Sequence, residues 1–347
     1  MHRRTFTRTL VAAALATTMA AAGCSGDDAD DAGSASGGTQ SLEKVTYLTS
    51  FGMFGRDAYA YVAKEKGYFR DAGFDVDIKA GSGTLDNLKA ITSGQAQFTP
   101  LDLTGLLLAA GRKDNPVTGF AAVAGIQQRT MAAIISLEGN GIATPKDLEG
   151  KTLADTPSSV VRNLFPTYAK LANIDETKVT WQNGTPQTLM GTLASGGAAG
   201  IGQFVVGKPT VETVAKGKKA VVLPYSDYLQ DLYGNVLVTS SSYAEKNPEK
   251  VKKFSAALLK GLEDSIANPA EAGDMLKKNQ PTANPQGAAA ELTLMGPFVK
   301  SEASGVPVGA LDSQRVARSI AILQGSGQIG AGLTPEKVID FDLVPKA

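Results

Sequence analysis

From residue 42 to the end of the chain, segments with the polar and apolar period of a strand alternate with segments that have the period of a helix. Residues 74–78 alternate apolar and acidic side chains, as a half-buried strand does. Residues 57–69 instead place Ala58, Tyr61 and Val62 on one helical face, with Gly67 in a position to end the helix. This alternation predicts an α/β fold with mainly parallel sheets.

The pattern divides the predicted elements into two similar sets. In the first set, strands are expected near 44–49, 74–78, 95–99, 120–126 and 131–137, with helices at 57–69, 85–93 and 103–111. In the second set, strands are expected at 152–155, 179–182, 201–206 and 220–224, with helices at 160–173, 186–194 and 209–215. A further strand at 235–240 precedes a long helix at 248–267.

The first 23 residues have the pattern of a secretory signal peptide: a basic start, an apolar stretch too short to span a bilayer, and small residues before Cys24. Residues 21–24 resemble a bacterial lipobox, in which the cysteine is lipidated and becomes the new N-terminus. Residues 24–41 are rich in Gly, Ser and Asp and are expected to form a flexible linker. We therefore expect export and lipid anchoring to the outer face of a bacterial cytoplasmic membrane, by either the general secretory or the twin-arginine route.

Composition excludes several classes of function. The chain of 347 residues has 34 basic and 34 acidic side chains, so it offers no basic surface for nucleic acid. Cys24 is the only cysteine and His2 the only histidine, and both lie in or next to the signal peptide. Disulfides, Cys or His metal sites, Ser-His-Asp triads and cysteine nucleophiles are therefore excluded from the mature chain. We expect no metal, no cofactor and no catalytic residue.

Two further features have structural interpretations. Residues 325–330 match G-x-G-x-x-G by letters, but they follow a predicted helix instead of a strand, so we interpret them as a helix-terminating loop. Three tyrosines end the second set, and the sequence leaves open whether they line a cleft or pack at the edge of a core: Tyr225, Tyr228 and Tyr233.

The strand-to-helix turns are the candidate functional sites. Carboxyl ends of parallel strands meet at one edge of a sheet, where the helix N-termini expose N–H groups to a ligand. In the turn at 50–57, Phe51 and Phe54 could sandwich a planar ligand, while Arg56 or Asp57 could fix a charge. The alternative is that both rings fold back into the core and the Arg-Asp pair only begins a helix.

Three segments resemble one family. Residues 61–74 (YVAKEKGYFRDAGF), 142–153 (IATPKDLEGKTL) and 247–251 (NPEKV) are similar to segments of the solute-binding proteins of ABC importers. The subgroup is the one that includes sulfonate, taurine, nitrate and thiamine-pyrimidine binders. The resemblance implies a type II periplasmic-binding-protein fold with lobe one at 42–130 and 235–347, lobe two at 131–234, and a two-strand hinge between them.

The resemblance also implies ligand contacts from the turns of both lobes and from the hinge. Carried over by position, they are Ser50, Phe51, Met53, Phe54, Arg56, Ser82, Thr84, Asp102, Thr104, Gln128, Thr156, Ser158, Ser159, Asn183 and Gln203.

The implied function is capture of a small organic solute for delivery to ABC permease subunits, by a monomer held at the membrane through its lipid anchor. The two phenylalanines favour a planar heterocycle such as a thiamine-precursor pyrimidine, whereas Arg56 would favour an alkanesulfonate, taurine or nitrate-type anion. Another class of function is an anchored sensor that binds a protein partner. Catalysis is disfavoured because the similar fungal thiamine-pyrimidine synthases use an internal histidine and a cysteine-rich motif, which the mature chain lacks.

Overall fold

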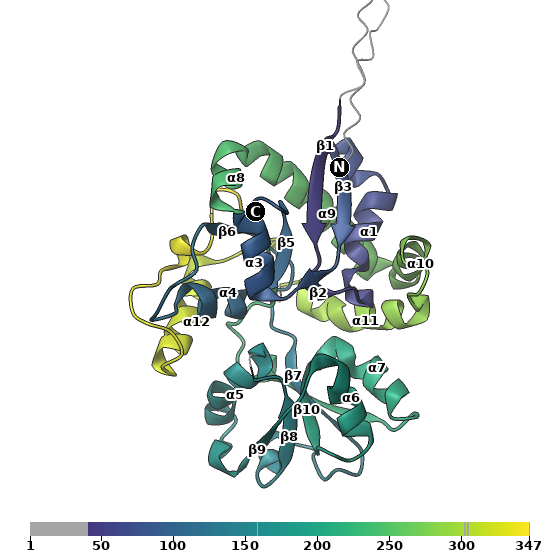
Figure 1. The fold of residues 1–347 in the computed structure, drawn as a ribbon, viewed down its shortest axis with the longest axis vertical. Coiled ribbons are helices and arrows are strands. Elements are labelled where there is room, and N and C mark those ends of the chain that lie inside the picture. The colour runs from purple at the N-terminus through teal and green to yellow at the C-terminus, as the bar shows by residue number, and fades with distance from the viewer. Residues whose placement is uncertain (1–40, 158, 302, 304, 347) are drawn as a thin grey trace, which may run out of the picture. The chain divides into compact units, whose positions relative to one another are not determined.

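The computed structural model describes residues 41–157, 159–301, 303 and 305–346, which form alternating strands and helices (Figure 1). The predicted signal peptide at 1–23, the predicted lipidation site Cys24 and all but the last residue of the predicted linker lie outside the described residues. Within the part of the chain that is described, no helix combines the length and the apolar character needed to cross a bilayer.

Lobe one, as we use the term, is built on five strands. Strand β1 (Glu43–Leu48) pairs in parallel with β3 (Phe74–Lys79), and a separate sheet has the order β5 (Thr99–Asp102), β12 (Asn235–Ser240), β6 (Phe120–Gly125). A single parallel bridge between Tyr47 and Phe98 connects β1 to the residues just before β5. Strands from both ends of the chain therefore complete one lobe.

The helices of lobe one cover these strands around a cluster of aromatic rings. Phe254 stacks on Phe98 with 3.8 Å between ring centroids and on Phe69 at 4.9 Å. The predicted helix at 57–69 is interrupted at Gly67, whose positive φ of 79° ends one helix and allows the next to begin. The helices are α1 (Ala58–Glu65), α2 (Tyr68–Asp71), α3 (Thr84–Thr92), α4 (Leu103–Ala110), α8 (Ser241–Lys246), α9 (Pro248–Ala267), α10 (Pro269–Asn279), α11 (Pro285–Val299) and α12 (Ser313–Gly325).

Lobe two is a five-stranded sheet with α5 (Val160–Leu171) on one face and α6 (Pro186–Ala194) with α7 (Lys208–Val214) on the other (Figure 1). Neighbouring residues of one strand serve opposite faces: Ile134 belongs to the apolar cluster of α5, and Ile135 to that of α6 and α7. Burial on both faces explains why this strand (Ala132–Leu137) is apolar except at Ser136, whose hydroxyl donates to the Ala199 carbonyl at 2.6 Å. The strand order is β11 (Ala220–Pro224), β7 (Ala132–Leu137), β10 (Gly200–Phe204), β8 (Thr152–Asp155), β9 (Thr180–Asn183).

Two crossing segments connect the lobes and are hydrogen-bonded to each other. The Gln127 backbone N–H donates to the Asn235 carbonyl at 3.0 Å, and the Thr130 N–H donates to the Leu232 carbonyl at 2.8 Å. The result is a two-lobed α/β fold with paired connections. The residue bounds that the sequence suggests for the lobes stay a prediction.

Two sequence-based expectations about the strands are wrong. The sheets are mixed instead of mainly parallel, because β7 and β12 run antiparallel to their neighbours. Each of these strands enters its sheet directly from a crossing segment, without the crossover helix that parallel pairing requires. The strand expected at 95–99 is instead Thr99–Asp102, which contains Pro100. Proline is tolerated there because β5 is the end strand of its sheet, where the missing N–H leaves no ladder bond unmade.

The remaining structural interpretations are settled by the fold. The G-x-G-x-x-G match is confirmed as a helix-terminating loop, since α12 ends at Gly325 and Gly327 has a φ of 75°. Tyr225 and Tyr233 are buried in the core, whereas Tyr228 is 40 % exposed with its ring edge against Tyr168.

The buried Asn87 on α3 ties three turns of lobe one together. Its side-chain nitrogen donates to the Thr49 carbonyl at 2.8 Å and to Thr99 Oγ1 at 2.9 Å. Its side-chain oxygen accepts from the Ser82 backbone N–H at 2.8 Å. One amide therefore fixes the ends of β1 and β4 (Gly81–Ser82) relative to the start of β5.

We predict that Asn87→Ala lowers the free energy of unfolding by about 3 kcal/mol, because the buried Thr49 carbonyl, the buried Thr99 hydroxyl and the partly buried Ser82 N–H lose their partner at once. Urea unfolding followed by circular dichroism measures the change. Gln95→Ala, an amide deletion at an exposed position nearby, is the control and should change stability by less than about 0.5 kcal/mol. Equal effects of the two substitutions would contradict the role of Asn87.

Candidate functional site

The turn at 50–57 presents aromatic rings to solvent. Phe51 and Phe54 are each 39 % exposed, so the alternative that both rings fold back into the core is wrong. Asp57 is buried and accepts a hydrogen bond from the Phe54 backbone N–H at 3.0 Å, which closes the turn. Met53 faces the core, where its sulfur accepts from the Tyr61 hydroxyl at 3.0 Å.

A short antiparallel strand pair joins the turn at 50–57 to the turn at 81–84. Strand β2 (Phe51–Gly52) pairs antiparallel with β4, so that Phe51 faces Ser82 and Gly52 faces Gly81. The Ser50 carbonyl accepts from the Gly83 N–H at 3.1 Å. Gly81 cannot be replaced without movement, because a Cβ there would lie 1.9 Å from the Thr49 carbonyl oxygen. The two predicted turns of lobe one therefore form one surface.

The starts of α3 and α4 meet beside this surface. A Cβ on Gly105 of α4 would lie 2.9 Å from Thr84 Oγ1 of α3, so the absence of a side chain there permits the contact. Asp102 caps α4 by accepting from the backbone N–H groups of Thr104 at 2.9 Å and Gly105 at 3.4 Å. Burial raises the pKa of the Asp102 carboxyl to about 6, against the lowering effect of these hydrogen bonds.

The first turn of lobe two is organised by Asp155, which the sequence analysis did not select. This buried carboxylate, the last residue of β8, accepts from the Thr156 N–H at 2.7 Å and from the Ser159 hydroxyl. Ser159 in turn caps α5 by accepting from the Arg162 N–H at 3.1 Å. Burial raises the pKa of Asp155, partly offset by its hydrogen bonds. Asp102, which the sequence did predict, is also the last residue of its strand. The same position at the end of β8 could have identified Asp155 as a site residue.

Other predicted contacts in lobe two are held by their own neighbours. Asn183 accepts from Arg162 Nη1 at 2.6 Å, and the guanidinium lies 5.3 Å from the centre of the Trp181 ring. The Gln203 side-chain oxygen accepts from the Phe204 N–H at 2.9 Å. Ser158 lies outside the described residues.

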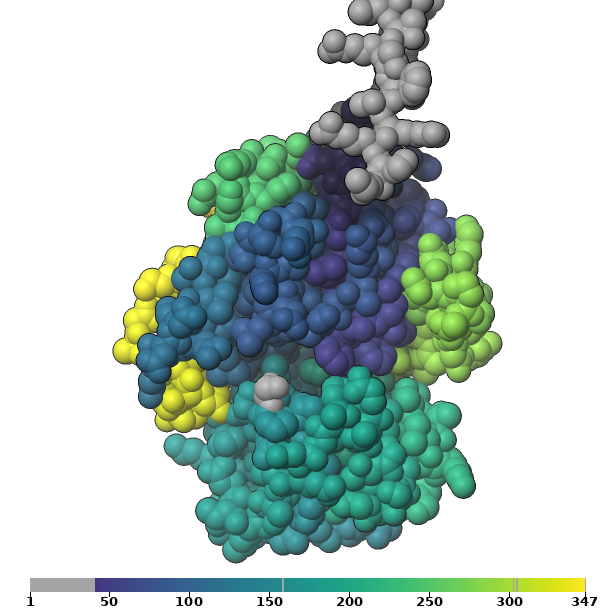
Figure 2. All heavy atoms as spheres, in the orientation of Figure 1, coloured from purple at the N-terminus to yellow at the C-terminus, as the bar shows by residue number. Residues whose placement is uncertain are grey.

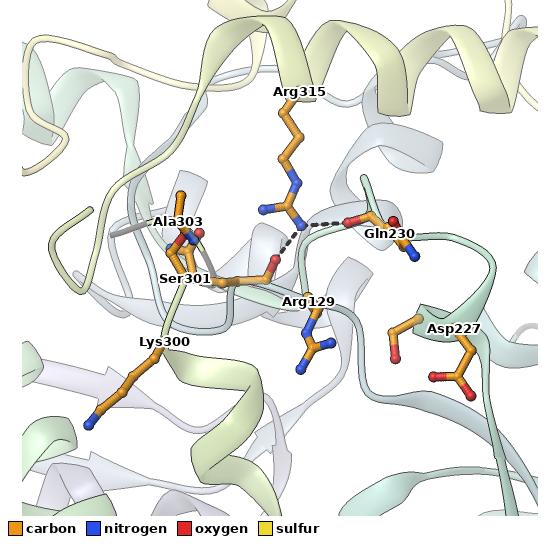
Figure 3. Close-up of a pocket in the computed structure, with 9 residues that line it drawn as sticks. Arg129, Asp227, Gln230, Lys300, Ser301, Ala303 and Arg315 are labelled. Atoms are coloured by element: carbon orange, nitrogen blue, oxygen red, sulfur yellow. Dashed lines mark hydrogen bonds between the residues drawn. The ribbon is translucent and has the colours of Figure 1, made fainter. Parts of the chain in front are cut away.

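Gln128 is placed in the crossing segment instead of in a strand-to-helix turn. Its side-chain nitrogen donates to the Ala310 carbonyl at 2.9 Å. It borders a cavity of about 430 Å³ in which Arg315 donates to the carbonyl oxygens of Gln128 and Gln230 (Figure 3). None of the other predicted site residues lines this cavity.

Arg56 connects the turn of lobe one to lobe two. Its guanidinium carbon lies 4.5 Å from the centre of the Phe54 ring and 5.9 Å from the centre of the Phe204 ring at the end of β10. Its backbone N–H donates to Glu291 Oε2 of α11 at 2.9 Å. Sequence reasoning missed Phe204 and Glu291, which no local motif marks. Figure 2 shows the surface hollowed where the purple-to-blue segments meet the teal segments.

The acidic side chains of the turns are dispersed among the described residues. Among the residues that the structure describes, no three or more His, Cys, Asp or Glu side chains are grouped as metal ligands would be. The described carboxylates of the turns instead accept hydrogen bonds from the backbone of their own turns.

Comparison with known proteins finds relatives named as binding proteins and relatives named as synthases. It is 26 % identical to the formylaminopyrimidine-binding protein of Halalkalibacterium halodurans, over 71 % of this chain and 73 % of that protein. It is 26 % identical to the riboflavin-binding protein RibY of Chloroflexus aurantiacus, over 88 % of this chain and 87 % of that one. It is 25 % identical to a 4-amino-5-hydroxymethyl-2-methylpyrimidine phosphate synthase of Aspergillus parasiticus, over 67 % of this chain and 69 % of the synthase.

Among solved structures, the periplasmic aliphatic sulphonate binding protein SsuA of Escherichia coli superposes with a TM-score of 0.68 at 14 % identity, covering 87 % of this chain and 99 % of that one. This likeness confirms the type II periplasmic-binding-protein fold. Residues 57–272 match the family described as NMT1/THI5 like, and that match covers more than half of the chain. The chain therefore belongs to the NMT1/THI5-like family.

Proposed function

We propose that this protein is the extracytoplasmic solute-binding component of an ABC importer. The observation that carries the proposal is the surface formed by the turns of lobe one, which presents two exposed phenylalanine rings and faces Phe204 of lobe two through Arg56. The relatives that are named as binding proteins support it. Its partners are the solute and the permease subunits, and lipidated Cys24 holds the monomer at the outer face of the cytoplasmic membrane.

The carboxylates of the turns favour a ligand that donates hydrogen bonds. Helix N-termini bind anions through unpaired N–H groups, but here α4 and α5 are already capped by Asp102 and Ser159. With a pKa of about 6, Asp57 and Asp102 are ionised at neutral pH. The starts of α1 and α3 differ, because their N-cap residues, Asp57 and Gly83, make no side-chain capping hydrogen bond. An anionic sulfonate or nitrate therefore meets more negative charge than free donors.

A planar heterocycle fits the apolar part of the same surface. The exposed rings of Phe51 and Phe54 offer faces for stacking, and aromatic stacking adds about 0.5–1.5 kcal/mol beyond the burial of area. An aminopyrimidine of the thiamine-precursor type combines such a flat ring with N–H donors. We therefore propose this class of solute, with alkanesulfonates and nitrate as the alternative.

We propose binding without catalysis, although one relative is named as a synthase. The only histidine and the only cysteine of the sequence are His2 and Cys24. The sequence of the two lobes, residues 42–347, therefore contains no imidazole or thiol that could act as general base or nucleophile.

Thermal melting of the purified full-length protein against a panel of solutes tests the proposal. The panel contains pyrimidines, flavin-like compounds, alkanesulfonates, nitrate and amino acids. A solute present at about 100 times its dissociation constant adds about 2.7 kcal/mol of stability, which raises the melting temperature visibly. A shift with pyrimidines or other heterocycles supports the proposal. A shift with sulfonates alone supports the anion alternative, and no shift at all leaves a solute outside the panel or a protein partner as the next hypothesis to test.

We predict that Phe54→Ala weakens binding of the stabilising heterocycle by about tenfold, because a stacking face worth about 1.4 kcal/mol is lost. The loss of affinity should be greater for Phe54→Ala than for Arg56→Ala. Isothermal titration calorimetry measures both. Leu171→Ala is the control, since this side chain is 50 % exposed at the far end of α5. The reverse order of the two effects would identify an anionic ligand.

We also predict a pH dependence for Asp102. Its pKa is about 6 in the folded protein, above the ordinary value of an unfolded aspartate, so the folded state binds the proton more tightly. Stability from this group is complete below about pH 4 and is lost as the pH rises through 6. From pH 4 to pH 7, the wild type should lose about 3 kcal/mol relative to Asp102→Asn, which does not titrate.

Urea unfolding of both proteins at pH 4, 5, 6 and 7 measures this difference. Gln95→Ala, an exposed substitution that removes no titratable group, serves as the control and should show a difference that does not vary with pH. A constant difference between the wild type and Asp102→Asn would contradict the raised pKa.

A further inference from the structure

The Arg56 guanidinium lies against two aromatic rings that come from different lobes. Phe54 belongs to the turn of lobe one, and Phe204 ends β10 of the lobe-two sheet. The distances from the guanidinium carbon to the ring centres are 4.5 Å and 5.9 Å, both within the range of a cation–π interaction. The flat guanidinium cation therefore contacts one aromatic ring from each lobe.

The guanidinium is held weakly, although its backbone is fixed. The Arg56 N–H is bound by the buried Glu291, but the guanidinium makes no hydrogen bond or ion pair with the described residues. Among the described residues, its close contacts are the two rings, one of which is 39 % exposed, and the buried carboxylates of Asp57 and Glu291 act on its charge without pairing with it. Cation–π contacts at exposed sites contribute about 0.5–1 kcal/mol. A competing group can therefore displace the side chain at small cost.

The charges around Arg56 favour a cation at this place. The carboxylates of Asp57 and Glu291 both interact with the positive charge of Arg56. Both carboxylates are buried in the turn and in α11, and neither moves out to pair with the guanidinium directly. A planar cation or a ring with N–H donors that replaced the guanidinium would keep this favourable environment, whereas an anion would not.

We propose that Arg56 is a placeholder for the ligand and thereby sets the specificity of the site. Its guanidinium occupies the position of the ligand's ring between Phe54 and Phe204, and the ligand binds by displacing it. The site then selects flat groups that resemble a guanidinium, namely rings bearing an amidine edge, over anions of similar size. This inference rests on the proposed function and adds to it the role of Arg56 as a competitor instead of a ligand contact.

Benzamidine tests the inference, because its benzamidinium ion is a flat ring with an amidine edge. Binding to the full-length wild type, Arg56→Ala and Arg56→Gln is measured by calorimetry at constant ionic strength. Removing a competitor worth about 1 kcal/mol should tighten binding about fivefold in both variants. Arg70→Ala, which removes an exposed arginine from α2, should bind like the wild type.

A second substitution locates the probe. Adding Phe204→Ala to Arg56→Ala should remove the gain, because the aromatic face from lobe two is then missing. Benzenesulfonate, with the same ring and the opposite charge, should bind more weakly than benzamidinium to every variant. Unchanged or weaker benzamidinium binding in both Arg56 variants would overturn the inference. The proposed function is judged separately, by the melting panel on the wild type, so the two failures are distinguishable.

Discussion

The backbone N–H groups at the start of a helix need acceptors, and this constraint organises the whole candidate site. In many anion-binding proteins these groups are left for the ligand. In this chain, Asp102 takes the N–H groups of α4, and Ser159, itself bound to Asp155, takes that of α5. These hydrogen bonds hold the turns in place, and the carboxylates that accept them are buried beneath the surface. The N–H groups that these side chains bind therefore do not need an acceptor from the ligand.

The same turns determine what remains for recognition. Because the polar groups face inward, the exposed features of the first turn are the rings of Phe51 and Phe54, with Arg56 against one of them. Asn87 holds that turn in register with β4 and β5, so the rings are presented by a fixed backbone. The fold is shared with sulfonate binders, whereas the ligand that we propose for this site is a donor-bearing ring. Fold and ligand class are therefore separate questions here.

Local patterns were sufficient for most of the elements and insufficient for the pairs of residues that the fold brings together. Strand β11 and helix α9 are found at the predicted residues, because period and flanking turns lie within a short window. The strand was predicted too early, at 95–99, because Pro100 is atypical of a strand and is tolerated only in the edge strand β5. Phe204 and Glu291 were missed because they approach Arg56 from residues far along the chain, and neither stands in a motif. Asp155 was also missed, although its position as the last residue of a predicted strand was a signal for it.

The central claim is that the site selects a flat donor-bearing ring over an anion. The most direct measurement is calorimetric titration of the full-length protein with two compounds, 4-amino-2-methylpyrimidine and an alkanesulfonate, under identical conditions. The account predicts that the aminopyrimidine binds at least about tenfold more tightly, a difference of about 1.4 kcal/mol. Tighter binding of the alkanesulfonate would contradict it.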